Sequence, residues 1–271
     1  MSTNPASLAV TSAGSLSDVG RKPRDSRTFR RYGAAVLLVV SALTVAVNRV
    51  VAPGLLEDDG IAILREAAAS PERTSAAVWL RVVSAMTLLP AFLVAARMAM
   101  RRRPVLATWA LVVNGAAYLG AGLAFHAMGP LIQVAAEQPE GQYGVLANYL
   151  NEFSDNAVST LSAALFIVGH LIGGVLMGLA LRGTIPTPAW VAIAVAMPAH
   201  FVVYVLLQNL VLDAFAWGLM ALGFVVCAVI LIRMPNDEWE PAPLGSLNGV
   251  PAKYRSAAEN FVGWLRSSPC A

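Results

Sequence analysis

The sequence predicts an all-α integral membrane protein, a six-helix transmembrane bundle with its N and C termini inside the cell. Of the 271 residues, 57% are hydrophobic and only 13% are charged, whereas soluble domains carry about a quarter charged residues. The apolar residues also fall into blocks that are long enough to cross about 30 Å of hydrocarbon. Basic residues gather in alternate connections between these blocks, as membrane topology signals do.

The apolar blocks give the expected boundaries of the bundle, which fills residues 33–233. The first block is too long for the apolar core of a cleavable signal, so we expect it to be retained. Only a few residues around Gln208–Asp213 separate the last two blocks. If that segment makes no turn, one long helix replaces them and the count falls to five. The six expected spans are 33–52, 76–99, 105–127, 158–181, 188–208 and 213–233.

The orientation follows from the distribution of lysine and arginine. Fifteen of these residues fall in the expected inner segments, and only Arg65 and Arg73 fall in the outer loops. The outer loops instead hold nine acidic residues. Because basic loops resist translocation, both termini are expected on the cytoplasmic side of the cell membrane. The basic residues flank spans, so they indicate contact with membrane lipids rather than with nucleic acid.

The segments outside the membrane are short. Residues 1–32 form a basic N-terminal segment that is expected to be disordered. Residues 234–271 form a cytoplasmic tail, which begins with a Pro/Gly-rich linker and continues as an amphipathic helix at 252–266. That helix either lies on the inner leaflet or docks on the inner loops. Short helices are also expected in the outer loops 54–75 and 128–157, the latter on the outer surface.

Small residues recur at every fourth position in the third and fourth spans. Lipid does not drive helices together, so close packing between membrane helices depends on such residues. We expect them to pack mainly within the chain rather than in a dimer. Pro90 and Pro198 lie inside spans, where each can kink its helix. The small residues are Ala116, Gly120 and Ala124 in the third span and Gly169, Gly173, Gly174 and Gly178 in the fourth.

Polar side chains form stripes inside the spans, at spacings that place them on one helix face. Buried polar groups need partners, so the stripes should face the bundle interior. His170 and His200 lie about 17 and 18 Å from the inner ends of their spans, hence level near the midplane. The candidate ligand-binding residues are Arg49, Arg81, Asn114, Tyr118, His126, His170, His200, Tyr204, Gln208 and Asp213.

Most of the stronger charges fall toward the outer ends of the spans. We therefore expect a polar cavity that is open to the outside and floored by His170 and His200. A buried Arg81 calls for an acidic partner, for which Asp213 and Glu152 are the candidates. Each histidine could instead only fasten two helices, and Arg49 could extend to the interface.

Four functions fit this pattern. The first is a pocket for a small molecule or lipid, used in transport or sensing. The second is an electron-transfer protein with haem b ligated by His170 and His200. The third is a membrane enzyme acting on a lipid-like or isoprenoid substrate, and the fourth is a structural partner subunit. No catalytic motif and no metal-ligand spacing singles out a reaction.

The segment "GGVLMGLALRGTIPTPAW", residues 173–190, combines a glycine-rich span, a short basic loop and a Pro-x-Trp restart. In these features it resembles bacterial multi-pass membrane proteins of unknown function. The resemblance implies a helical membrane fold and carries no activity with it.

Overall fold

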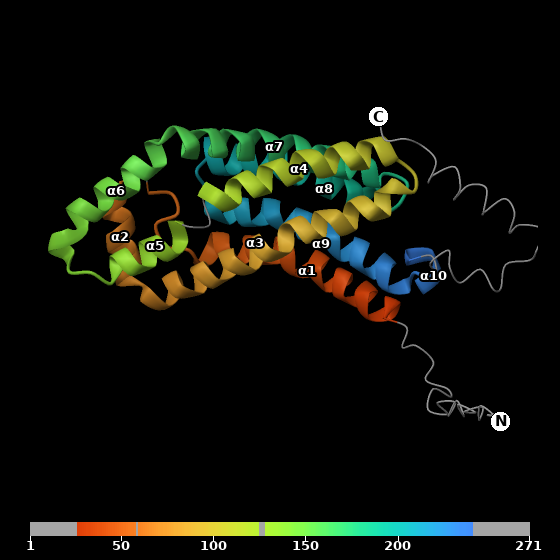
Figure 1. Ribbon diagram of the computed structural model, residues 1–271, viewed down its shortest axis with the longest axis horizontal. Helices are drawn as coiled ribbons and strands as arrows, with labels where there is room; N and C mark the ends of the chain where they lie inside the picture. The colour runs from red at the N-terminus through yellow and green to blue at the C-terminus, as the bar shows by residue number, and fades with distance from the viewer. Residues whose placement is uncertain (1–25, 58, 125–127, 241–271) are drawn as a thin grey trace, which may run out of the picture.

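The computed structural model describes residues 26–57, 59–124 and 128–240, and every regular element in these ranges is helical (Figure 1). This confirms the all-α prediction for the described residues. Within them, five helical segments are long and apolar enough to cross a membrane. They are α1 (Arg27–Val51), α3 (Pro71–Met100), α7 (Ala157–Leu181), α8 with η2 (Thr187–Leu206) and α9 (Leu210–Arg233).

The third expected span forms α4 (Pro104–Ala124), which packs lengthwise against α7. Its apolar stretch, taken over the residues whose side chains are described, runs from Pro104 to Gly120. The last residues of this expected span, 125–127 with His126, lie outside the described residues. The sixth crossing therefore stays a prediction.

The helices reach beyond the apolar blocks that predicted them. α1 begins at Arg27 rather than 33, and α3 begins at Pro71 rather than 76. Hydropathy marks only the part of a helix that suits hydrocarbon, whereas backbone hydrogen bonding continues into the polar flanks. Pro71 begins α3 because a helix's first residues need no backbone N–H partner.

The last two apolar blocks form separate helices. α8 (Thr187–His200) passes into a π-helical turn, η2 (Phe201–Leu206), three residues after Pro198, which supplies no backbone N–H. The chain then reverses at Gln208, whose φ is +48°. α9 starts at Leu210, where the Asn209 side chain accepts a hydrogen bond from the Leu212 N–H at 3.0 Å.

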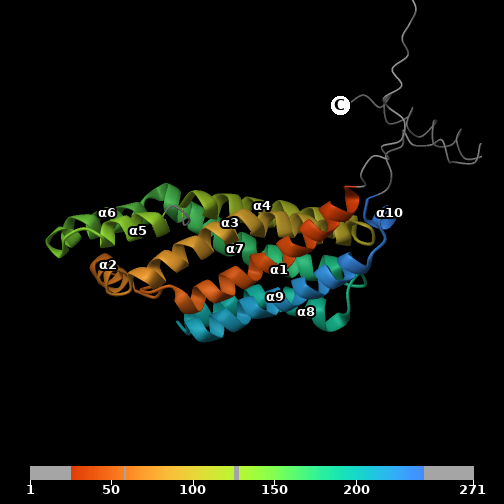
Figure 2. The ribbon, with the colours of Figure 1, turned by 90° about the horizontal axis from the view of Figure 1, so that it is seen from below.

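Three short helices gather at one end of the bundle, here named the cap end (Figures 1 and 2). They are α2 (Gly60–Ala69), α5 (Met128–Ala136) and α6 (Tyr143–Asp155), the last preceded by the turn η1 (Glu140–Gln142). A small apolar core of Leu64, Ala135, Tyr143 and Leu150 joins them. Helices were expected in both loops, but α5 was not. α6 continues outward from the start of α7 rather than folding over the bundle.

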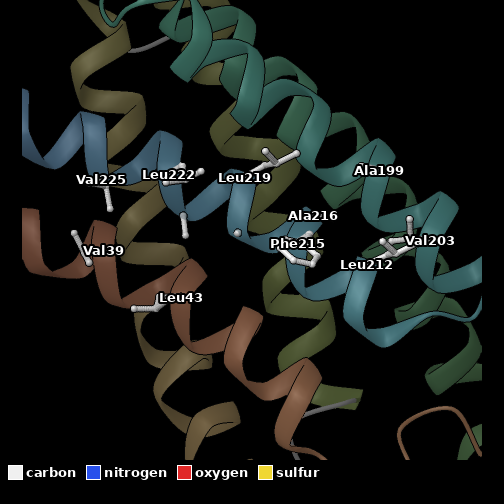
Figure 3. A pocket seen from close by; sticks show the side chains of 12 residues that line it. Val39, Leu43, Ala199, Val203, Leu212, Phe215, Ala216, Leu219, Leu222 and Val225 are labelled. Carbon is white, nitrogen blue, oxygen red and sulfur yellow. The ribbon is translucent and has the colours of Figure 1, made fainter.

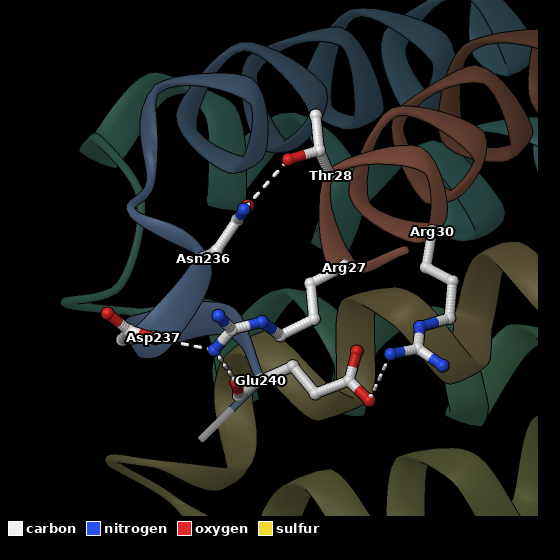
Figure 4. A network of polar contacts seen from close by, with 6 residues as sticks. All are labelled: Arg27, Thr28, Arg30, Asn236, Asp237 and Glu240. Carbon is white, nitrogen blue, oxygen red and sulfur yellow. Dashed lines mark hydrogen bonds and ion pairs between the residues drawn. The ribbon is translucent and has the colours of Figure 1, made fainter. Parts of the chain in front are cut away.

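The opposite end, named the basic end, holds the start of α1 and the short helix α10 (Asn236–Trp239) (Figure 4). Arg27 pairs with Asp237 at 2.5 Å, and Arg30 pairs with Glu240 at 3.0 Å. The Arg97 guanidinium lies 4.3 Å from the centre of the Trp239 ring, which is buried. The prediction of a linker is therefore wrong for residues 236–240, because acidic side chains and a tryptophan dock them onto arginines. The expected tail helix 252–266 lies outside the described residues.

The glycines of α7 allow close packing inside the chain. A Cβ at Gly169 would lie 2.7 Å from the Ala117 Cβ, and a Cβ at Gly178 would lie 2.6 Å from the backbone N of Ala194. These contacts join α7 to α4 and α8, as the expected intramolecular packing requires. The stripe predicted on the third span is wrong at Ala116, which is exposed, whereas Ala117 is buried. Gly120 does face α7, since a Cβ there would lie 4.0 Å from the carbonyl oxygen of Ser162. The sequence shows which residues of α4 are small, but not which face of the helix packs against α7.

Gly178→Ala is expected to destabilise the fold by about 1–3 kcal/mol, because the backbone of α8 must move to admit the methyl group. Gly33→Ala is the matched control, since a Cβ there meets nothing within 4 Å. The control should be neutral or slightly stabilising, as alanine favours helix over glycine. Thermal unfolding in detergent compares the two variants, and equal midpoints would contradict this account of α7.

Candidate functional site

A buried group of charged side chains joins three helices near the cap end. Asp213, in the first turn of α9, is fully buried. Its Oδ1 accepts a hydrogen bond from the Nδ1–H of His200, the last residue of α8. Its Oδ2 lies 3.0 Å from the Nε of Arg49, in the last turn of α1. Asp213 and Arg49 each sit at the helix end whose dipole favours their charge.

The expected partner of Arg81 is therefore wrong, since Asp213 pairs with Arg49 instead. Arg81 packs against the start of α5, where a Cβ at Gly129 would lie 3.5 Å from the Arg81 Cδ. No carboxylate of the described residues forms an ion pair with Arg81. The rotation of each helix about its own axis decides which arginine meets Asp213. The spacing of polar residues in the sequence did not predict these rotations precisely enough.

Tyr204 links this group to the loop that follows α1. Its ring stacks on His200 with centroids 5.5 Å apart, and the Arg49 guanidinium lies 4.9 Å from its centre. The Tyr204 hydroxyl donates a hydrogen bond to the carbonyl of Leu55 at 3.3 Å. A movement of the loop at Leu55 would therefore reach both Arg49 and His200 through one side chain.

The two histidines lie side by side, as their expected depth suggested. The ring centroids of His170 and His200 are 5.3 Å apart. The Nδ1–H of His170 donates to the carbonyl of Phe166, one turn earlier in α7, and the two rings stack at 4.3 Å. The Trp217 ring packs edge-on to His200 at 5.6 Å. Aromatic rings thus fill the space around both imidazoles.

Several polar atoms in this core have no hydrogen-bond partner among the described residues. They come from α4, α7 and α9, and each side chain is at most 9% exposed. A desolvated polar group without a partner costs about 1–3 kcal/mol. These unpaired polar groups lower the stability of the fold. Polar groups that are kept despite such a cost are typical of functional positions. The atoms are Asn114 Oδ1, Tyr118 OH, His170 Nε2 and Trp217 Nε1.

A cavity of about 590 Å³ opens at the cap end, directly beside this buried group. Arg49 lines it, and the side chain of Arg49, which is 14% exposed, also pairs with Asp213. Arg73, which donates to the carbonyls of Val51 and Val50 at the end of α1, is a second arginine in the lining. The remaining charged residues of the lining are Glu57 and Glu66.

The cavity wall depends on a tight turn at Gly54. Its φ of +62° is in the left-handed region that glycine adopts without strain. The Gly54 N–H donates to the Glu66 carboxylate at 2.6 Å, which ties the turn to α2. The first residues of α9, Leu210 and Val211, close the other side. The N-terminus of α9 therefore also faces the cavity.

Of the proposed ligand residues that the structure describes, only Arg49 lines this cavity, and the expected floor of His170 and His200 is not part of it. Gln208 is exposed in the turn after η2, because the π-helical turn breaks the four-residue spacing that placed it with Tyr204. Asn114 and Tyr118 lie deeper, against α7. Trp217, Arg73, Glu57 and Glu66 were not among the predicted site residues. Arg73 could have been proposed, because Arg65 and Arg73 are the two basic residues of outer loops that hold nine acidic residues.

The haem alternative meets a steric obstacle in this arrangement. Axial histidines lie on opposite faces of a haem, whereas the rings of His170 and His200 pack directly against each other. Neither histidine lines the cavity at the cap end. Haem ligation would therefore require α7 and α8 to separate. The described residues also contain no cluster of three or more His, Cys, Asp or Glu side chains that could hold a metal ion.

Comparison with known proteins gives no relative from which a function could be carried over. No family model, no curated protein and no solved structure matches this chain.

Proposed function

We propose that this chain crosses the membrane six times, with the cap end outside the cell and the basic end in the cytoplasm. Helices α1 and α10, near the two ends of the described chain, meet at the basic end, and a chain that starts and ends on one side crosses an even number of times. α4, which is about 31 Å long by its helical rise, completes the count. The arginines around α10 support the orientation, because basic segments stay in the cytoplasm.

The proposed function is the binding, at the cap end, of a ligand that carries a phosphate or carboxylate group. The single observation that carries this proposal is that Arg49 both lines the cavity and pairs with Asp213, which accepts a hydrogen bond from His200. Arg73 and the N-terminus of α9 add a second cation and a helix end that favours anions. The cavity volume falls within the usual range for small-ligand pockets, about 300–1,000 Å³.

The same geometry favours sensing as the purpose of binding. An acidic ligand at Arg49 competes with Asp213 for the guanidinium, and so alters the partner of His200. The contact from Tyr204 to Leu55 gives a second connection between the cavity wall and the core. Ligand occupancy would therefore shift the packing of α8 and α9, whose ends carry these residues.

Glycerol 3-phosphate is the probe that tests this function. Binding raises the stability of the folded state by about 2.7 kcal/mol at a concentration of one hundred times Kd, so thermal unfolding in detergent reports it. We expect Arg73→Gln to weaken the apparent affinity about tenfold, a loss of about 1.4 kcal/mol. Arg73 is exposed and lies outside the buried ion pair, so this variant should fold.

The matched control is Arg65→Gln, which removes another exposed arginine of the cap end. Arg65 pairs with Glu140 at 3.0 Å and does not line the cavity. The control should keep the affinity of the unaltered protein. Equal affinities for all three proteins, or no stabilisation by the probe, would overturn the proposed site.

A further inference from the structure

An apolar trough runs along the outer face of α9, between α1 and the end of α8 (Figure 3). Its volume is about 560 Å³, and every residue that lines it is apolar. Val39 and Leu43 form one wall, and Ala199 and Val203 form the other. Gly218 lies in the floor, where an added Cβ would meet nothing within 4 Å. The trough is thus open to any chain that the surrounding lipid supplies.

Exposed apolar side chains lie between the trough and the cavity at the cap end. On α1, the exposed side chains of Leu43, Val47 and Val50 lie on one helix face, and Val50 lines the cavity. On α9, Val211 lines the cavity, and Phe215, one turn further, is an exposed residue of the trough. Two apolar stripes therefore lead from the charged cavity down the surface of the bundle.

The length of the trough matches a lipid chain that enters from the leaflet at the cap end. Leu212 and Val225 mark its extent on α9, a rise of about 20 Å. The hydrocarbon core of a bilayer is about 30 Å thick, so the trough spans somewhat more than one leaflet. A water-soluble ligand would leave this surface unused.

The charges of the cavity indicate the kind of head group. Its lining holds two arginines, Arg49 and Arg73, and two glutamates, Glu57 and Glu66. A lining with both signs complements a head group with both signs better than it complements an anion. An ethanolamine phospholipid carries a phosphate and an ammonium on one head group, with acyl chains attached.

We propose that the ligand is an ethanolamine phospholipid, with its phosphate at Arg49 and Arg73, its ammonium toward Glu57 and Glu66, and one acyl chain in the trough. This proposal rests on the proposed function, because it names the source of the acidic group bound at Arg49. It adds the trough and the glutamates as determinants of specificity.

Gly218→Leu tests the trough, because it adds a side chain to a lining residue whose new Cβ would meet nothing within 4 Å. Gly33→Leu is the matched control, an exposed glycine of α1 that also has open space around it and does not line the trough. The purified full chain is titrated with palmitoyl-oleoyl phosphatidylethanolamine or phosphatidylglycerol, and bound lipid is counted by native mass spectrometry. Glycerol 3-phosphate binding is measured on the same samples.

We expect one phosphatidylethanolamine per chain, bound at least about tenfold more weakly after Gly218→Leu and unchanged after Gly33→Leu. Glycerol 3-phosphate should bind the Gly218→Leu protein normally. If both variants hold the lipid equally while Arg73→Gln weakens it, the trough is not its site and this inference is overturned, although the proposed function stands. Equal or tighter binding of phosphatidylglycerol overturns the choice of head group. Loss of all dependence on Arg73 overturns the proposed function itself.

Discussion

Replacing Asp213 with alanine is expected to destabilise the folded protein by about 3–5 kcal/mol. The substitution leaves the Arg49 guanidinium buried without its counter-ion and removes the acceptor of the His200 N–H. Breaking one partner of a buried ion pair costs that much because the remaining charge is uncompensated. Thermal unfolding in detergent, followed by circular dichroism, measures the loss against the unaltered chain.

The control for Asp213 is the double variant Arg49→Gln with Asp213→Asn, which removes both charges and keeps similar shapes. It should lose less stability than Asp213→Ala, since neither charge stays buried without its partner. A double-mutant cycle between the two positions gives their coupling energy, expected at about 0.5–3 kcal/mol. Strictly additive losses would mean that the contact between Arg49 and Asp213 contributes nothing to the fold.

Trp217→Ala is the second substitution with a large expected effect, a loss of about 3–5 kcal/mol. The Trp217 side chain is 1% exposed and lies in the main apolar core, with its ring against His200. The truncation leaves a void next to both imidazoles, which the surrounding helices can fill only in part. Trp79→Ala, at an exposed position of α3, should have little effect on the same unfolding midpoint.

Trp217→Phe separates the role of the ring from that of the indole N–H. The Nε1 atom has no hydrogen-bond partner among the described residues, so phenylalanine removes an unpaired donor and keeps most of the packing. We expect a change of less than about 1.5 kcal/mol. A loss as large as that of Trp217→Ala would show that the N–H is engaged in the native protein, contrary to this description of the core.

Most of the helical framework could be predicted from hydropathy. The fourth span is the clearest case, since α7 covers 157–181 and 158–181 was expected. Its ends are marked by strong local signals: Asn156 caps the start, accepting a hydrogen bond from the Val158 N–H at 2.8 Å. α10 was missed because four residues give no periodicity, and their position depends on arginines that lie more than one hundred residues away in the chain.

The residues of the buried charged group were predicted from the sequence, but the contacts between them were not. Depth along a helix depends on residue count alone, so the sequence predicted His170 and His200 at the same level, and their ring centroids are 5.3 Å apart. Partner choice depends on the rotation of each helix, which the polar stripes gave too coarsely to separate Arg49 from Arg81 as the partner of Asp213. The stripe through Gln208 failed for a local reason, the π-helical turn that follows Pro198.

In the proposed orientation the cavity faces the outside and the basic end faces the cytoplasm. Single-cysteine variants test it, in a background where Cys270→Ser removes the thiol of the tail and Cys227 is buried. Glu137→Cys reports the cap end and Glu238→Cys reports the basic end, both at exposed positions. The measurement is labelling of intact spheroplasts with a membrane-impermeant maleimide. With the cap end outside, Glu137→Cys is labelled at once and Glu238→Cys only after lysis. Labelling of both from the same side would contradict the proposed orientation.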